Sequence, residues 1–449
     1  MPGIVYRNAG SVGVALVVWC ISGCFAMIEV LCYAELAALL PAAGGGYAFV
    51  TAGSRSLGKY GDVVPFMYAW SSLLVSDPMS AAYQGLTFAS YALSIVYGDC
   101  VTPYTTKLIT ALTFTALGIV LNCISVKTSA RVQDVLSTFK CAVLVSIIIT
   151  GAVSAFRVNK LADAPLFIGV TTPSSIVRAV FGASACFGGC NAIASIAEEI
   201  SNPTRNIPIA YVTGVLILTA IYVLTNVAFF VVLDAPTVAS SEAIAVSFAT
   251  VTWGSTAASC IPAIVSVSAF GTLCAGFFTS SRLKLSAARQ DHLPSVLSFV
   301  NVDTSVPVVS VILHGFFALL YTFAGSLSFI IDTVSFVYSV NEILTMVCFF
   351  VLRSSMKDVP RPFRVVTVIP LLHLAITVTL IVVSLVKPSG YVQYVILLLG
   401  YLTGAVYYVV FVRLKTDAPG GEAVSVFVQK LLMCLPCVNQ LDLMLKEKL

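Results

Sequence analysis

Long apolar runs follow one another along almost the whole chain. Each run continues for about 20 residues or more and lacks the strict alternation of a barrel strand, so it predicts a membrane-spanning helix. Short segments that hold most of the charged residues separate the runs. We predict an all-α membrane protein with eleven spans, at residues 11–40, 63–97, 104–125, 130–154, 174–200, 206–233, 256–285, 306–325, 327–352, 365–387 and 390–412.

The composition excludes several classes of function. The chain has 449 residues, of which 59% are hydrophobic and 10% are charged, and its mean hydropathy is +0.99. Soluble domains do not have this composition, so the lipid bilayer is the first expected partner. The net charge of +4 gives no nucleic-acid signal. No grouping of nucleophile, base and orienting residue is recognisable, so we do not expect an enzyme.

The positions of the basic residues predict the topology. One set of alternate loops holds 17 Lys and Arg and the other set, with its flanking helix ends, holds 6, while Lys140 lies within a span. The richer set faces the cytoplasm under the positive-inside rule. We therefore expect one transmembrane domain over residues 1–413 and a cytoplasmic tail over residues 414–449. Met1 then lies outside, which we explain by a helix that belongs before Met1 or by a wrong division of residues 306–352.

Paired glycines interrupt a membrane-length helix within residues 177–208. Gly188 and Gly189 lie in the motif FGGCN at residues 187–191. Glycine leaves helical dihedrals at little steric cost, and broken backbone in a membrane survives where it lines a cavity or is buried in protein. A glycine-interrupted helix therefore points to the substrate site of a transporter. The alternative is that both glycines only allow close packing of helices.

Lys140 lies inside the span 130–154. An ammonium group there is unfavourable in lipid, so it should face the interior of the bundle. It can stand where a transporter would otherwise bind Na⁺, or shuttle protons. The alternative is that Lys140 extends to the inner interface, about nine residues from Arg131.

Several carboxylates also lie in or near the spans. We expect a structural role for Glu35, near the inner end of the first span, and leave Glu29 open. Glu198 and Glu199 follow the interrupted helix and precede Arg205. We interpret this acidic pair as a cytoplasmic gate or a clamp on a turn.

Aromatic residues of the span 327–352 are weaker candidates. Phe336 and Tyr338 can line a pocket, although an aromatic residue on an apolar helix is more often part of the core. Asp332 and Glu342 in the same span favour the pocket slightly.

Most of the thirteen cysteines lie in apolar runs, where they are more often packing residues than ligands. No histidine accompanies them, so we expect no metal site. Cys100 lies in an external loop, where an unpaired cysteine favours a disulfide to another chain. The alternative is a free thiol. Cys434 and Cys437 are weak evidence for a metal site, and acylation fits them at least as well.

Four segments together resemble a known family. They are YAELAALLPAAGGGYAFV, SVKTSARVQDVLSTFK, FGGCNAIASIAEEISNPTRNIPIA and FTSSRLKLSAARQDHLPSVLS. They are similar to the L-type amino acid transporters, the light chains of heteromeric amino acid transporters in the amino acid–polyamine–organocation superfamily. The similarity runs from about Gly3 to Arg413, in order and at matching spacing.

The resemblance implies a fold, an activity and a partner. The fold is a LeuT-like bundle of twelve helices, with two inverted five-helix repeats and two extra helices. The activity is Na⁺-independent exchange of amino acids by alternating access, without a cofactor. A disulfide from Cys100 to a single-span glycoprotein heavy chain is implied as well. Lys140 matches the family lysine that replaces the sodium site.

The resemblance also implies a substrate site. Gly188, Gly189 and Asn191 match the unwound part of the sixth family helix, where the α-amino group of the substrate is held, and Phe336 matches a pocket aromatic of the tenth. The candidate substrate-binding residues are Ala185, Phe187, Gly188, Gly189, Asn191, Phe336 and Ser339.

The sequence departs from the family at several of these positions. Ala185 replaces a gating aromatic, and Cys190 replaces a tryptophan beside Asn191. Tyr338 and Ser339 stand where some members have Asn and Trp. The first family helix, which carries a Gly-Ser-Gly break, has no counterpart here, so the resemblance predicts eleven helices rather than twelve.

We therefore expect a plasma-membrane exchanger of neutral amino acids, including large ones, and we expect this chain to be inactive without an upstream helix. Two alternatives stay open. One is a non-transporting subunit that binds a heavy chain, and the other is a proton-coupled amino acid symporter that uses Lys140.

Overall fold

The computed structural model describes residues 2–97, 102–157, 159–163, 165–169, 172–241, 243–323, 327–386, 392–414 and 421–436. Helices make up nearly all of this part of the chain, as the apolar runs predict. Within it, eight helices are long and apolar enough to cross a membrane.

Every predicted span coincides with one helix or with consecutive helices. The membrane helices are α2 (Val12–Leu39), α4 (Val63–Ser71) continued through the π-turn η2 (Ser72–Ser76) into α5 (Asp77–Tyr97), α6 (Tyr104–Ile124), α7 (Val126–Ser154), α9 (Pro173–Ser184), α10 (Pro203–Val232), α14 (Ile261–Arg289), α15 (Val308–Thr322), α16 (Leu327–Ser355), α17 (Val368–Val386) and α18 (Val392–Tyr407) with its π-helical end η6 (Tyr408–Arg413).

Short elements connect these helices or extend beyond them. They are α1 (Pro2–Ala9), α3 (Gly46–Ser54), η1 (Arg55–Tyr60), α8 (Lys160–Asp163), η3 (Ala185–Phe187), η4 (Cys190–Glu199), α11 (Ala235–Ser240), α12 (Ile244–Thr252), α13 (Ser255–Ala258), η5 (Ser295–Ser298), β1 (Phe299–Asn301), α19 (Gly421–Leu432) and β2 (Cys434–Pro436). The strands β1 and β2 pair antiparallel, with Asn301 opposite Cys434, and so attach the tail to the loop before α15.

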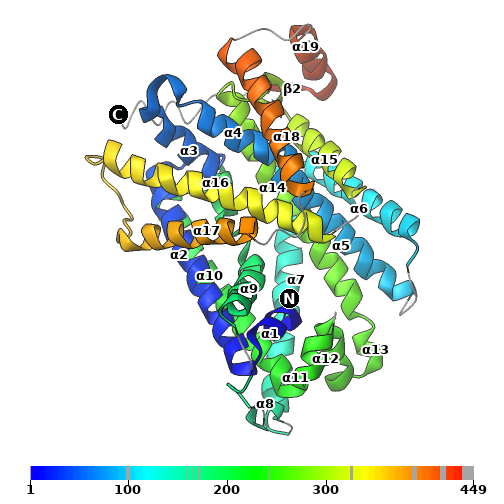
Figure 1. Ribbon diagram of the computed structural model, residues 1–449. Helices are drawn as coiled ribbons and strands as arrows, with labels where there is room; N and C mark the ends of the chain where they lie inside the picture. The colour runs from blue at the N-terminus through cyan, green and yellow to red at the C-terminus, as the bar shows by residue number, and fades with distance from the viewer. Residues whose placement is uncertain are drawn as a thin grey trace.

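The long helices cross one another in a single bundle (Figure 1). Helix α2 packs along α10, and α14 runs between α5, α6 and α7. Helix α16 packs against α3 and α17. Several large apolar side chains of the outer helices α17 and α18 are about half exposed, as expected for surfaces that meet lipid: Leu371, Val382, Leu398, Leu399 and Leu402.

Glu35 ties one end of this bundle together. Its fully buried carboxylate accepts hydrogen bonds from Arg353 of α16, from Arg361 and from the amide of Val365, at distances from 2.6 to 3.0 Å. Buried charges need such partners. The contacts agree with a structural role for Glu35, because they join α2 to α16 and to the loop that follows it.

Candidate functional site

The predicted interruption is present between α9 and α10. Helix α9 ends at Ser184, and two 3₁₀ segments, η3 and η4, follow on either side of Gly188 and Gly189. Gly189 has φ +89° and ψ 0°, a left-handed conformation that favours glycine. A second irregular residue, Ile196, has φ −110° and ψ 19° within η4. The span 174–200 is therefore a short helix followed by unwound chain.

The space around Gly189 distinguishes the two interpretations of the glycine pair. No atom of the described residues lies within 4 Å of the place where a Cβ atom at Gly189 would stand, and both Gly188 and Gly189 are exposed. At Gly23 of α2, in contrast, a Cβ atom would collide with Thr219 of α10. Gly23 is thus a close-packing glycine, whereas Gly189 borders open space.

Helix α10 satisfies part of the unwound backbone. The Tyr222 hydroxyl donates a 3.0 Å hydrogen bond to the carbonyl of Cys186, and the amide of Ala194 donates to the Tyr211 hydroxyl, also at 3.0 Å. Buried main-chain groups need partners when helical bonds are lost. These contacts hold both sides of the interruption against α10.

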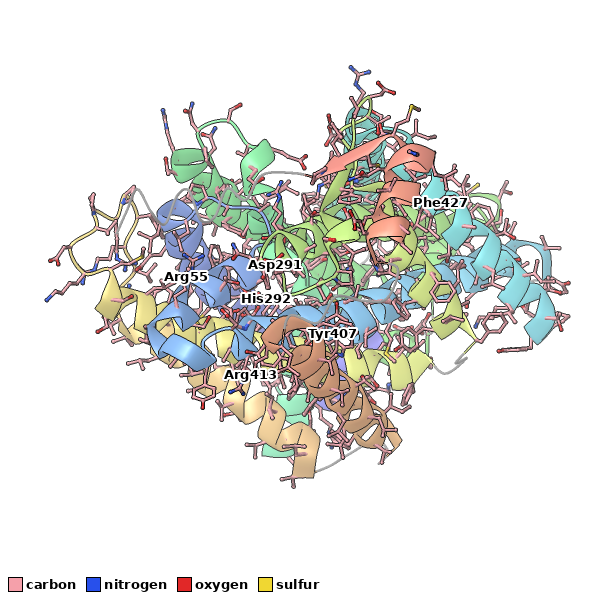
Figure 2. The ribbon with its side chains drawn as sticks, turned by 90° about the horizontal axis from the view of Figure 1, so that it is seen from above. Arg55, Asp291, His292, Tyr407, Arg413 and Phe427 are labelled. Atoms are coloured by element: carbon pink, nitrogen blue, oxygen red, sulfur yellow. The ribbon has the colours of Figure 1, made fainter. Side chains whose placement is uncertain are left out.

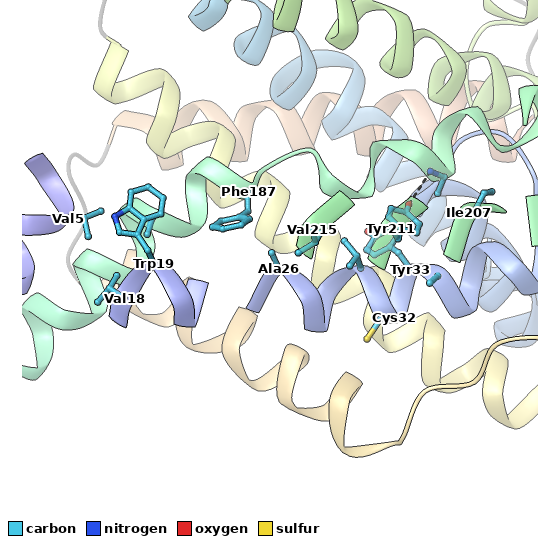
Figure 3. Close-up of a cluster of buried hydrophobic side chains, with 14 of the residues drawn as sticks. Val5, Val18, Trp19, Ala26, Cys32, Tyr33, Phe187, Ile207, Tyr211 and Val215 are labelled. Atoms are coloured by element: carbon cyan, nitrogen blue, oxygen red, sulfur yellow. Dashed lines mark hydrogen bonds between the residues drawn. The ribbon is translucent and has the colours of Figure 1, made fainter. Parts of the chain in front are cut away.

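Phe187 belongs to the core beside the interruption. Its side chain is 4% exposed, and its ring meets that of Tyr222 edge-on at 5.2 Å between centroids. Figure 3 shows it in a row of buried side chains, between Trp19 and Val215. Phe187 therefore supports the turn at Gly188 and Gly189 from the core.

The C-terminal end of η4 is held by two ion pairs. Glu198 accepts two 3.1 Å hydrogen bonds from Arg289, and Glu199 accepts one of 2.8 Å from Arg282. Glu198 also accepts from the amide of Ala43 at 3.0 Å. Both arginines belong to α14, so the acidic pair clamps η4 to that helix; the sequence pointed to the neighbouring Arg205 instead.

Lys140 contacts the same helix from α7. Its Nζ atom donates a 2.8 Å hydrogen bond to the hydroxyl of Thr272 in α14, and the side chain is partly exposed. This contact joins two helices of the bundle. In the alternative interpretation, the Lys140 side chain would extend along its own helix to the membrane interface.

The candidates on α16 lie beside other helices. The ring of Phe336 meets that of Tyr394 in α18 edge-on at 5.4 Å, within a cluster that includes residues of α5. Ser339 donates to the carbonyl of Ser335 in its own helix at 2.9 Å.

Three further candidates are described in part or not at all. Ala185 and Asn191 have described backbone in η3 and η4, and their side chains lie outside the description. Cys100 also lies outside the described residues.

Two clusters of ionisable side chains lie inside the bundle, and the sequence alone did not predict that their members would meet. Lys284 of α14 pairs with Asp77 of α5, and Glu342 of α16 contacts Tyr33 and His373. Charges within membrane spans are functional candidates by default. Asp77 and His373 were detectable as polar residues inside the predicted spans 63–97 and 365–387, but their partners were not.

A cavity of about 350 Å³ lies at the ends of α2 and α10. Its lining includes Val12, Phe230, Lys160 and Asp234, and the last two form a 3.0 Å ion pair. None of the residues that line it belongs to the unwound segment. The cavity is therefore separate from the candidate site at Gly188 and Gly189.

Apolar helices that span a bilayer, with one unwound beside open space, define a multi-pass helical membrane protein of the kind that includes secondary transporters. The family model of amino acid permeases matches residues 2–411. This chain belongs to the amino acid permease family.

Characterised relatives extend the match. The chain is 29% identical over 421 residues to the b(0,+)-type amino acid transporter 1 of Mus musculus, covering 92% of this chain and 84% of the relative. It is 32% identical over 389 residues to the large neutral amino acids transporter small subunit 2 of Homo sapiens, covering 86% and 71%. It is 31% identical over 390 residues to the Asc-type amino acid transporter 1 of Mus musculus, covering 86% and 72%.

These similarities confirm the resemblance to light chains of heteromeric amino acid transporters. They agree with the all-α fold expected from the apolar runs. The relatives are transporters and not enzymes, in agreement with the expectation from the sequence.

Proposed function

We propose that this chain is the light chain of a heteromeric transporter and exchanges neutral amino acids across a membrane without Na⁺. The observation that carries the proposal is the unwound backbone at Gly189, which borders open space within a member of the amino acid permease family. The names of the relatives, which include a large neutral amino acids transporter, support this substrate class.

The unwound segment suits a zwitterion. Main-chain amides at the start of η4 point out of a helix end with a positive dipole, which favours a carboxylate. Carbonyl groups at the end of α9 favour an ammonium group. The carbonyl of Cys186 already accepts from Tyr222 and that of Gly189 from the amide of Ala192, so the carbonyls between them, at Phe187 and Gly188, are the ones that bind the substrate in this proposal.

Lys140 accounts for the independence from Na⁺. Its ammonium group donates to Thr272 of α14, at the place where the family resemblance puts the lysine that replaces the sodium site. Exchange then proceeds by movement of one group of helices against another, with the ion pairs of Glu198 and Glu199 closing the inner side.

A heavy chain and the plasma membrane complete the proposal. One relative is named a small subunit, which supports a larger partner for this chain. We place the partner on Cys100 and the tail after residue 413 in the cytoplasm, in keeping with the charge distribution.

Exchange in proteoliposomes tests the proposal. The chain, purified with its heavy chain, should take up labelled leucine when the vesicles contain unlabelled leucine, equally in Na⁺ and choline buffers. Empty vesicles should give background uptake.

The same assay separates the alternatives. Uptake driven by a pH gradient into empty vesicles would identify a proton-coupled symporter. No exchange of any of the twenty amino acids would identify a non-transporting subunit and overturn the proposal.

A further inference from the structure

Three titratable side chains from three membrane helices meet inside the bundle. The Tyr33 hydroxyl of α2 donates a 2.6 Å hydrogen bond to Glu342 Oε1 of α16. His373 Nε2 of α17 lies 3.4 Å from Glu342 Oε2. The side chains of His373 and Glu342 are 9% and 15% exposed, and Tyr33 is buried. Both oxygens of the Glu342 carboxylate are therefore engaged by groups that can carry a proton.

A second carboxylate joins this cluster. Glu29 lies one helical turn before Tyr33 on α2, and it interacts electrostatically with both Glu342 and His373. The single positive charge of an imidazolium can balance only one of the two ionised carboxylates. With both carboxylates ionised the cluster carries a net negative charge even when His373 is cationic, and uptake of one more proton makes it neutral.

The nearest other carboxylates among the described residues have basic partners of their own. Glu35, the next carboxylate along α2, already binds Arg353 and Arg361. Asp77 of α5 is paired with Lys284. Among the described residues, Cys32 of α2 and Tyr68 of α4 also interact electrostatically with Glu342, through a thiol and a hydroxyl group.

Unpaired charge in a membrane interior is strongly unfavourable, and two nearby carboxylates favour sharing one proton. The cluster is also placed to matter for transport, because Ser339 lies one turn before Glu342 on α16 and Phe336 lies one turn earlier still. Binding of a proton would thus change the charge on the helix that carries two candidate substrate residues.

We infer that Glu29, Glu342 and His373 form a binding site for one exchangeable proton within the membrane. In the binding step, a proton leaves hydronium and forms an O–H bond with a carboxylate oxygen of Glu29 or Glu342, and water is released. The inference goes beyond amino acid exchange, since the site is distinct from the unwound segment at Gly188 and Gly189.

Infrared difference spectroscopy during a pH titration of the purified protein tests the inference without requiring transport. The wild type should show a carboxyl C=O band that disappears as a buried carboxylic acid ionises. Glu342→Gln and Glu29→Gln should each remove or displace this band. His373→Gln should move its midpoint to higher pH by about one unit or more, because a cation that stabilises the ionised form is lost. Asp332→Asn, on the same helix, is the matched control and should leave the band unchanged.

The outcomes are distinct from those of the exchange assay. Loss of the band in either glutamine variant, with retention in Asp332→Asn, supports the site even if no amino acid is exchanged. A band that persists unchanged in Glu342→Gln and in Glu29→Gln would overturn the inference, as would a wild type without a titrating buried carboxyl. The glutamine variants keep the size of the side chain, and a monodisperse elution profile establishes that each one is folded.

Discussion

Lys284 Nζ lies 2.7 Å from Asp77 Oδ2, and the two side chains are 0% and 9% exposed. The pair joins the C-terminal part of α14 to the first residue of α5, directly after the π-turn η2. Lys284 also donates to the carbonyl of Ser280 at 3.3 Å, and the Ser280 hydroxyl contacts His314 Nδ1 of α15 at 2.7 Å. Three helices are thus connected by one buried polar network.

Breaking this pair should destabilise the protein strongly. Lys284→Met leaves the Asp77 carboxylate buried without its cation, and removal of one partner of a buried pair typically costs about 3–5 kcal/mol. Thermal unfolding of the detergent-solubilised protein measures the loss. Lys160→Met is the control, because its pair with Asp234 is exposed and should contribute less than about 1 kcal/mol.

A double variant separates the charge effect from packing. Asp77→Asn combined with Lys284→Met removes both charges, so it should recover much of the stability lost in Lys284→Met alone. If the melting temperature of the double variant is no higher than that of Lys284→Met, the buried charge is not the cause of the lost stability.

Substitution of the glycine at the interruption should affect conformation without a steric clash. Gly189→Ala places a side chain at φ +89°, at a cost of about 1–2 kcal/mol, although the space beside it is open. We expect reduced leucine exchange and a lower melting temperature. Gly182→Ala, within α9, meets ordinary contacts at 3.6 Å and should preserve or slightly raise stability. Equal behaviour of the two variants would contradict a special role for the Gly189 conformation.

The loop after α14 should make stability depend on pH. Burial lowers the pKa of His292 from 6.5 to about 4, although Asp62 and Asp291 oppose the shift. Its Nδ1 atom contacts the Tyr47 hydroxyl at 2.7 Å, and Figure 2 shows it beside Asp291. Since the unfolded state binds a proton more readily between these two pKa values, stability falls as the pH falls from about 6.5 towards 4.

The size of this effect can be measured with one variant. At pH 5 the His292 contribution to the loss is about 2 kcal/mol relative to neutral pH. His292→Gln removes the titrating group, so its melting temperature should fall less between pH 7 and pH 5 than that of the wild type. Identical pH slopes in the two proteins would show that His292 is not responsible.

Cys100 should determine covalent assembly with a heavy chain. Co-expression with the heavy chain should give a high-mass band on a non-reducing gel that reductant removes, and Cys100→Ser should abolish that band. Cys260→Ser is a suitable control, because Cys260 is an exposed cysteine before α14. A high-mass band that persists in Cys100→Ser and disappears in Cys260→Ser would reassign the linkage.

The sequence predicted the helices and the interruption because both depend on local chemistry. Apolar length fixed the eleven spans to within a few residues, except that α14 continues to Arg289, beyond residue 285. The glycine pair predicted the unwound segment, and Gly189 indeed has a left-handed conformation. Neither prediction required knowledge of which helices are neighbours.

The partners of the charged residues could not be predicted in the same way. Glu198 and Glu199 pair with Arg289 and Arg282, which are 91 and 83 residues away, and not with the adjacent Arg205. Lys284 entered the topology count as a loop charge, yet it is completely buried. Partner choice depends on helix packing, which a pattern along one chain does not reveal.

The carboxylate of Glu35 also sets a requirement on biosynthesis. Arg353 follows it by 318 residues, so at typical translation rates Glu35 waits roughly 15–60 seconds before its main partner is made. During that interval the Glu35 side chain of α2 lacks the arginines that bind it in the folded protein. The N-terminal helices therefore remain an unfinished assembly intermediate until α16 is inserted, and final closure of this bundle is a late, nearly post-translational event.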